Sequence, residues 1–157
     1  TNEGMNAGAL WYLLTAQGLM GAVLEDRELL TPLVEEALRL EPAASRVDRF
    51  ATRDVTMEGA QVGRDDLVIV SLAAANRDPA VYDAPDEFRL ERGEDAHVAF
   101  ALGPHICMGQ HLARLETVAL LDAVLDGLPG IELDPAESVG PRGLVFRKPA
   151  QVVAYWP

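Results

Sequence analysis

The single cysteine of the chain, Cys107, is the residue best suited to do chemistry. Gly103 and Pro104 interrupt the segment before it, and from Met108 onward apolar residues recur at helical spacing. We therefore expect Cys107 to lie at a helix N-terminus, where unpaired amides and the positive end of the helix dipole favour a thiolate over a thiol. A thiolate there can act as a nucleophile or as a metal ligand. Because an isolated cysteine more commonly packs as a small apolar side chain, its neighbours must decide between these interpretations.

The composition disfavours several classes of partner and compartment. A formal net charge of −12 over 157 residues opposes nonspecific binding to nucleic acid and to an anionic membrane face. One cysteine cannot form an intramolecular disulfide, and no positively charged leader with an apolar core is evident, so a reducing, cytoplasmic setting is expected. A hydrophobic content of 49% is enough for one core and favours a single domain.

The elements that must position the cysteine are mainly helical. The uncharged segment Ala7–Leu24, with Asn6 as its cap, is predicted to be one buried helix. Its length reaches the lower limit for spanning a bilayer, but its flanks are acidic and it lacks an aromatic belt at both ends, so no membrane is expected. Thr31 and Pro32 predict the start of a second helix that ends near Leu40.

The rest of the chain predicts small antiparallel sheets and loops around the cysteine helix. Val55–Met57 and Leu67–Val70 are extended runs separated by turn residues. The other expected elements are a short helix or turn at 73–79, an irregular surface loop at 83–94, an end to the cysteine helix at Gly127 followed by Pro129, and a hairpin at Leu144–Tyr155 with its tight turn at Lys148–Pro149. The predicted fold class is mainly α with small antiparallel β-sheets.

Two motifs occur in a fixed order along the chain. The first is Glu36-x-x-Arg39, and the second is Phe-x-x-Gly-x-His-x-Cys-x-Gly followed by Leu-Ala-Arg. Together they resemble the Glu-x-x-Arg pair and the haem-binding loop of the cytochrome P450 monooxygenases. Segments 75–79 and 85–88 resemble the region between these motifs in soluble bacterial members. The residues that match the loop are Phe100, Gly103, His105, Cys107, Gly109, Leu112, Ala113 and Arg114.

The resemblance covers most of the chain and implies the cytochrome P450 fold. Counting back from Glu36, Thr1 falls near the oxygen-activating threonine of the family's long central helix. Residues 1–157 are therefore expected to be the C-terminal portion of a single cytochrome P450 domain, from the central helix to the haem-ligand loop and the terminal hairpin. The N-terminal portion, with most of the substrate-recognition segments, would be absent.

The resemblance implies a set of haem contacts. Cys107 is implied as the axial ligand of the iron of haem b, where it donates electron density that favours cleavage of the O–O bond of dioxygen. His105 and Arg49 match positions that pair with the haem propionates. Phe100 is expected to pack near the sulfur and limit water, and Gly109 to let the backbone approach the ring.

The resemblance gives Glu36 and Arg39 a structural role. They would form a buried pair beneath the haem, completed by an arginine from the irregular loop. Glu87 occupies the place where many members have that arginine, so Arg92 is the first candidate and Arg89 the second. Spacing alone would make the same pair an exposed ion pair worth a few tenths of a kcal/mol.

Two more positions follow from the resemblance. Thr1 is the expected catalytic residue, because a hydroxyl near the distal side can help to deliver protons during oxygen activation. Its customary acidic partner would precede residue 1. Ala101 stands where glycine is usual in the family, and we expect this change to shift the loop or the haem potential slightly.

The implied function is that of a haem-thiolate monooxygenase, which inserts one atom of dioxygen into a small organic substrate by hydroxylation or epoxidation. Electrons would come from NAD(P)H through a ferredoxin reductase and a ferredoxin. The ferredoxin is expected to dock on the cysteine side, where Arg114 is a candidate contact. The high content of Ala, Leu, Arg and Asp resembles proteins of high-GC bacteria, in which these enzymes often tailor secondary metabolites.

Three other interpretations remain open from the sequence. The first is a zinc site, although the spacings of its candidate ligands do not follow the paired pattern of structural zinc sites. The second is a non-catalytic relative that keeps the fold and recruits partners. The third is a peroxide-driven member, which the loop disfavours because it resembles the dioxygen-dependent kind. The candidate zinc ligands are His97, His105, Cys107 and His111.

Overall fold

The computed structural model describes residues 1–92 and 97–157. Its α-helices are α1 (Asn2–Thr15), α2 (Leu19–Glu25), α3 (Leu30–Leu40), α4 (Leu72–Ala75) and α5 (Gln110–Gly127), and its 3-10 helices are η1 (Arg27–Leu29), η2 (Leu90–Arg92) and η3 (Gly103–His105). Its strands are β1 (Arg46–Phe50), β2 (Val55–Met57), β3 (Ala60–Val62), β4 (Leu67–Ser71), β5 (Glu132–Leu133), β6 (Val139–Arg142), β7 (Lys148–Gln151) and β8 (Ala154–Tyr155). The fold is thus mainly helical with small antiparallel sheets, as the sequence predicts.

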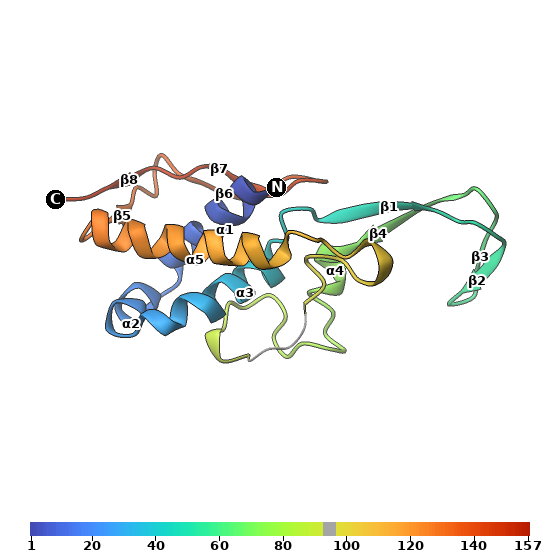
Figure 1. The fold of residues 1–157 in the computed structure, drawn as a ribbon, viewed down its shortest axis with the longest axis horizontal. Helices are drawn as coiled ribbons and strands as arrows, with labels where there is room; N and C mark the ends of the chain where they lie inside the picture. Colours follow the sequence, from blue (N-terminus) through green and yellow to red (C-terminus); the bar gives the residue numbers. More distant parts are fainter. Residues whose placement is uncertain (93–96) are drawn as a thin grey trace.

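Three helices form the core. In Figure 1, α5 lies alongside α3, and α1 packs against both of them. The buried apolar residues of the three helices fill the space between them, because each helix presents aliphatic side chains at helical spacing. The core residues of these helices include Met5, Ala9, Leu13, Leu33, Val34, Ala37, Leu38, Leu121 and Leu125.

The first helix differs from the prediction of one helix over Ala7–Leu24. The structure has α1 and α2, bent by 99° at the break between them. The break begins at Ala16, the C-cap of α1, where the backbone becomes extended with a ψ of 127°. Gly18, the N-cap of α2, then adopts a φ of 75°, a left-handed conformation that glycine reaches without steric cost. The helix also begins at Asn2, so Asn6 lies inside it and does not cap it.

The prediction of the start of α3 was wrong by a few residues. Asp26, not Thr31, provides the first cap: its side chain accepts a hydrogen bond of 2.9 Å from the amide of Glu28 and starts η1. The chain continues from η1 into α3 at Leu30, so Thr31 lies within the helix. The helix ends at Leu40, as predicted.

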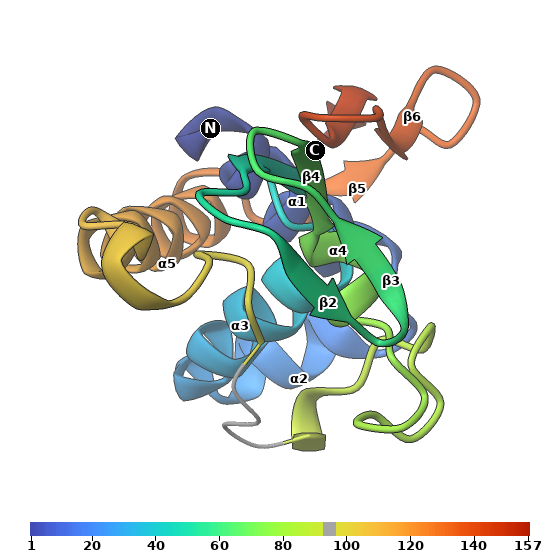
Figure 2. The same cartoon turned by 90° about the vertical axis from the view of Figure 1, so that its right-hand side faces the viewer.

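Within the described ranges 1–92 and 97–157, the strands pair as four separate two-stranded antiparallel sheets. β1 pairs with β4, so that Arg49 lies opposite Val68, and β2 pairs with β3. Figure 2 views the chain from the end that carries β2 and β3, with the helices behind. The sequence predicts β2 and β4, but it does not predict a separate strand at β1, which carries Arg49.

The terminal hairpin has a different register from the predicted one. β6 pairs with β7, and the chain turns between Arg142 and Lys148. Lys148 and Pro149 therefore lie in a strand and not in the turn. Gly143, with a φ of 131°, provides the conformational freedom that the turn needs. β5 and β8 form the last pair.

Within residues 1–92 and 97–157, no single helix is long and apolar enough to cross a membrane. The bent pair of α1 and α2 passes the same test by length and composition alone. The predicted surface loop at 83–94 contains η2, and its last two residues lie outside the described part of the chain.

Candidate active site

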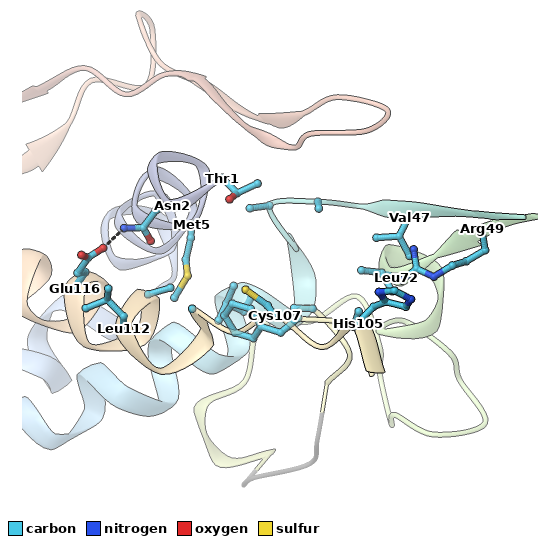
Figure 3. Close-up of a pocket in the computed structure, with 18 residues that line it drawn as sticks. Thr1, Asn2, Met5, Val47, Arg49, Leu72, His105, Cys107, Leu112 and Glu116 are labelled. Atoms are coloured by element: carbon cyan, nitrogen blue, oxygen red, sulfur yellow. Dashed lines mark hydrogen bonds between the residues drawn. The ribbon is translucent and has the colours of Figure 1, made fainter. Parts of the chain in front are cut away.

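A cleft of about 400 Å³ brings together most of the residues that the sequence singles out. Its walls come from the start of α1, from β1, from the segment 99–109 and from the first turns of α5. Figure 3 shows Cys107 in the middle of this cleft. The predicted site residues among its lining are Thr1, Arg49, Phe100, His105, Cys107 and Gly109.

The backbone holds Cys107 in a compact loop. The amide of Cys107 donates a hydrogen bond of 3.0 Å to the carbonyl oxygen of Phe100, and the amide of Ala101 donates one of 2.9 Å to Val98. The carbonyl oxygen of Cys107 accepts one of 3.3 Å from Gln110, the first residue of α5. Cys107 thus lies just before the helix begins, and its side chain is free and exposed.

Ala101 adopts a φ of 60°, a conformation that costs a non-glycine residue roughly 1–2 kcal/mol. The structure therefore explains why glycine suits this position better. Gly103, two residues later, has a φ of 73° and meets no such cost.

The segment before Cys107 is anchored by Asn76, the residue that follows α4. The side-chain oxygen of Asn76 accepts a hydrogen bond of 2.8 Å from the amide of Val98, and Asn76 itself is fully buried. This contact fixes the approach of the chain to the loop.

Arg49 and His105 lie at the same end of the cleft (Figure 3). Arg49 comes from β1 and His105 from η3, so the sheet and the loop together place these two nitrogen-bearing side chains. One guanidinium nitrogen of Arg49 donates 2.9 Å to the neighbouring carbonyl of Asp48. The guanidinium of Arg49 gives this end of the cleft a positive charge.

Gly109 borders the space next to the sulfur. A Cβ atom built on it would have only one neighbour, Cys107 Sγ, at 4.0 Å. The described residues therefore leave this side of the loop open, so that a flat group could lie close to the backbone there.

Thr1 precedes α1 and lines the same cleft as Cys107 (Figure 3). The side-chain amide nitrogen of the neighbouring Asn2 donates a hydrogen bond to the carboxylate of Glu116 on α5. This contact connects the start of α1 to α5. Thr1 therefore lies where a small bound molecule in the cleft could meet its hydroxyl.

Glu36 and Arg39 form a buried bidentate ion pair. The two hydrogen bonds are 2.7 and 2.8 Å long, and the residues are only 5% and 2% exposed. Arg92 donates a further hydrogen bond of 2.9 Å to Glu36, and the Arg89 side chain instead contacts Glu87. Of the two predicted candidates, Arg92 is the one whose side chain completes this network.

A second network surrounds Glu35, the residue just before Glu36. Arg114 donates two hydrogen bonds to Glu35, of 2.6 and 2.9 Å, and His97 Nε2 lies 3.1 Å from it. Burial by itself raises the pKa of Glu35, but the hydrogen bonds from His97 and Arg114 outweigh it and lower that pKa to about 2. Arg114 is therefore engaged within the chain, and its use as a docking contact stays a prediction.

The zinc interpretation finds no support in residues 1–92 and 97–157, since no group of three or more potential ligands converges there. His97 instead contacts Glu35. His105 and Cys107 both line the cleft, where they are available for another ligand.

The sequence interpretation did not identify Glu35, and it considered His97 only as a zinc ligand. The signal for Glu35 was weak, because a carboxylate next to Glu36 on a helix is most simply assigned to the exposed face. Its partners, His97 and Arg114, lie 62 and 79 residues away along the chain, so only the folded structure brings them together.

The chain has a mainly helical fold with small antiparallel sheets, and an exposed cysteine lies in its apolar cleft. These are the features that the sequence predicts for a haem-thiolate protein. The family model for cytochrome P450 matches residues 15–128, and the chain therefore belongs to the cytochrome P450 family.

Several relatives are similar to this chain over much of its length. Cytochrome P450 144 of Mycobacterium tuberculosis is 39% identical over 125 residues, which cover 79% of this chain and 29% of the relative. A biflaviolin synthase of Streptomyces coelicolor is 36% identical over 156 residues, which cover 96% of this chain and 38% of the relative. A 20-oxo-5-O-mycaminosyltylactone 23-monooxygenase of Streptomyces fradiae is 44% identical over 103 residues, covering 66% of this chain and 24% of the relative.

Solved structures agree with the family. A hydroxylase of himastatin biosynthesis superposes with a TM-score of 0.93 at 29% identity, and the match covers 100% of this chain and 43% of that structure. The cytochrome P450BioI, solved with an acyl carrier protein, gives a TM-score of 0.92 at 28% identity, covering 99% of this chain and 41% of that structure. The chain thus spans less than half the length of these relatives.

Proposed function

We propose that this chain is the C-terminal portion of a bacterial haem-thiolate monooxygenase that inserts one atom of dioxygen into a small organic substrate. The observation that carries the proposal is the position of Cys107, exposed in the middle of an apolar cleft with Arg49 and His105 at one end. Membership of the cytochrome P450 family supports the proposal, because in this family a cysteine thiolate binds the haem iron. Thiolate ligation favours cleavage of the O–O bond of dioxygen.

The described residues fit haem b, a flat apolar ring with two carboxylates at one edge. Gly109 leaves the space next to Cys107 Sγ open, and Leu112 and Met5 provide apolar walls. Arg49 and His105 would hold the propionates by charge-assisted hydrogen bonds. Cys107 Sγ would bind the iron, and the haem so bound would supply the oxygen chemistry.

The other site residues act around that group. Phe100 lines the cleft and limits access of water to the sulfur. The hydroxyl of Thr1 would hold a proton on the substrate side, so it is the proposed catalytic residue of this chain. Glu36, Arg39 and Arg92 would hold the fold beneath the cofactor.

The proposed overall reaction needs a source of electrons. One oxygen atom enters a C–H bond or an alkene, the other leaves as water, and two electrons and two protons are consumed. We infer that NAD(P)H supplies the electrons through a ferredoxin reductase and a ferredoxin, and that the protein works in the cytoplasm without nucleic acid or membrane. A relative named as a 20-oxo-5-O-mycaminosyltylactone 23-monooxygenase and a solved post-tailoring hydroxylase of himastatin biosynthesis support a secondary metabolite as the substrate.

The experiment is isotope labelling of the product formed by the full natural protein. Substrates are first selected from a panel of small apolar molecules by the change that they cause in the haem absorption spectrum. The selected compound is then incubated with ¹⁸O₂, NAD(P)H and a surrogate ferredoxin system. Incorporation of one labelled atom, lost in Cys107→Ser, is expected. Haem-loaded protein that gives no oxygenated product would contradict the proposed activity, and protein that binds no haem would favour a non-catalytic recruitment role.

A further inference from the structure

Glu35 is the one carboxylate in the described residues that reaches both flanks of the cysteine loop. It projects from α3 and accepts hydrogen bonds of 2.6 and 2.9 Å from Arg114, which lies on α5 after the cysteine. It also lies 3.1 Å from Nε2 of His97, which precedes the cysteine. One side chain thus connects the chain before Cys107 with the helix after it.

Both ring nitrogens of His97 make hydrogen bonds within the chain. Its Nδ1 atom accepts a hydrogen bond of 3.2 Å from the amide of Ala99, so Nδ1 carries no proton. The ring proton therefore lies on Nε2 and is donated to Glu35. His97 is held at both nitrogens, and its side chain is only 5% exposed.

Arg114 and His97, the two partners of Glu35, both contact the ring of Phe100. The Arg114 guanidinium lies 4.5 Å from the centre of the Phe100 ring, and the His97 ring lies 6.2 Å from it in a tilted contact. The carbonyl oxygen of Phe100 accepts the amide hydrogen of Cys107. A displacement of Phe100 would therefore be transmitted directly to the backbone of the cysteine.

Arg114 also reaches the start of the cysteine helix. Its remaining guanidinium nitrogen, Nη1, donates a hydrogen bond of 3.1 Å to the side-chain oxygen of Gln110, and the backbone amide of Gln110 donates to the carbonyl oxygen of Cys107. Arg114 thus links Glu35 to the residue that fixes the C-terminal side of the loop. Lysine could not replace it fully, because the planar guanidinium makes these contacts in several directions at once.

We propose that Glu35 is a positioning residue for the cysteine ligand: through His97 and Arg114 it fixes Phe100 and Gln110, and so holds Cys107 Sγ toward the cleft. The inference rests on the proposed haem-thiolate function and adds a role for a residue outside the Glu36, Arg39 and Arg92 network. The same hydrogen bonds from His97 and Arg114 lower the pKa of Glu35.

The test uses the full natural protein in its haem-loaded form. The reduced protein is treated with carbon monoxide, and its absorption band separates thiolate from thiol ligation during incubation at neutral pH. In Glu35→Gln one carbonyl acceptor remains but the charge is lost, and we expect thiolate ligation to decay about tenfold faster. The matched control is Glu25→Gln, which removes the same charge from an exposed residue at the end of α2 and should change nothing.

A second variant, Arg114→Lys, keeps the proposal testable if the Glu35→Gln protein does not bind haem. This substitution keeps the positive charge but removes the planar guanidinium that makes two hydrogen bonds to Glu35 and contacts Phe100. We expect the same faster decay of thiolate ligation. The midpoint of thermal unfolding is measured alongside, because a merely structural role would lower it without changing the ligation at temperatures where the protein is folded.

The outcomes separate the two proposals. Decay in the variants at the rate of the unsubstituted protein, with a normal thiolate band throughout, would overturn the positioning role while leaving the proposed function intact. Absence of any thiolate band in the unsubstituted, haem-loaded protein would instead overturn the proposed function itself.

Discussion

Two adjacent glutamates on α3 serve different networks. Residues that follow one another on a helix lie about 100° apart around its axis, so Glu35 and Glu36 face different neighbours. Glu36 is 5% exposed and pairs with Arg39 and Arg92, whereas the Glu35 side chain is 30% exposed and pairs with Arg114 and His97. The same residue type therefore has two distinct consequences when it is substituted.

Substitution of Glu36 tests the buried network. Glu36→Ala leaves the guanidinium groups of Arg39 and Arg92 without their carboxylate, and removing one partner of a buried pair costs about 3–5 kcal/mol. We expect expression of the full protein to give little or no bound haem, measured as haem per protein. Glu137→Ala, at an exposed position, is the control. Full haem content in Glu36→Ala would contradict the assignment.

Acid should weaken the Glu35 network. The pKa of Glu35 lies at about 2 in the folded chain against a usual value of 4.5, so its contribution to stability is fully present above about pH 5 and is lost as the pH falls toward 2. The measurement is the difference in unfolding free energy between the unsubstituted protein and Glu35→Gln. This difference should be constant at neutral pH and shrink below about pH 4.5. A difference that does not depend on pH in this window would be inconsistent with the account.

Relief of backbone strain should stabilise the cysteine loop. Ala101→Gly removes the cost of a φ of 60° and should raise the unfolding free energy by up to about 1 kcal/mol. Gly103→Ala makes the reverse change at a φ of 73°, with no other atom within 4 Å of the new Cβ, and should lower it by a similar amount. Urea unfolding measures both. Changes of the same sign in the two variants would contradict a conformational cost of alanine at a positive φ.

At the scale of elements, the break between α1 and α2 sets the direction of the chain. Ala16 ends α1 and Gly18 precedes α2, and the bend of 99° between the helices lets α1 pack against α3 and α5 while α2 leads into η1. A straight helix of the same length would carry these apolar residues away from the core.

A pair of glycine substitutions tests this break. Gly18→Ala forces a φ of 75° on alanine and should destabilise the protein by about 1 kcal/mol. Gly21→Ala, in the middle of α2 with nothing within 4 Å of the new Cβ, should instead stabilise it by roughly 0.5–1 kcal/mol. Thermal unfolding of the two variants should therefore shift in opposite directions. A stabilising Gly18→Ala would rule out the conformational explanation.

Local signals predicted some elements well and others poorly. β2 has the predicted bounds and α3 ends where expected, because the turn residues after Met57 and the helix-stopping Pro42 after Leu40 are local signals. The bend at Gly18 was missed, since glycine inside an apolar run is compatible with a continuing helix. The register of the terminal hairpin was missed too, because Pro149 lies in a strand opposite Pro141.

The candidate site was predictable where a compact motif carries it. Cys107, His105 and Gly109 follow one another closely, and the structure places them on one cleft. The arginine that completes the buried network was narrowed to two candidates, and Arg92 makes the contact. Glu35 could not be found in this way, because its partners are distant in sequence.

At the scale of the whole molecule, the cleft is assembled from segments far apart in the chain, from Thr1 to Glu116. The chain spans 41% and 43% of two solved relatives, and it exposes large apolar side chains on α5 and β1. Leu112, Leu115 and Phe50 are 60%, 69% and 69% exposed. We infer that bound haem and the rest of the full protein cover these surfaces.

The absorption spectrum of the reduced carbon monoxide adduct of the full, haem-loaded protein tests the central claim most directly. We predict the band of a thiolate-ligated haem in the unsubstituted protein and its complete loss in Cys107→Ser, because Cys107 is the only cysteine among these 157 residues. A thiolate band that persists in Cys107→Ser, or one that is absent from the unsubstituted protein, would contradict the assignment of Cys107 as the ligand of the haem iron.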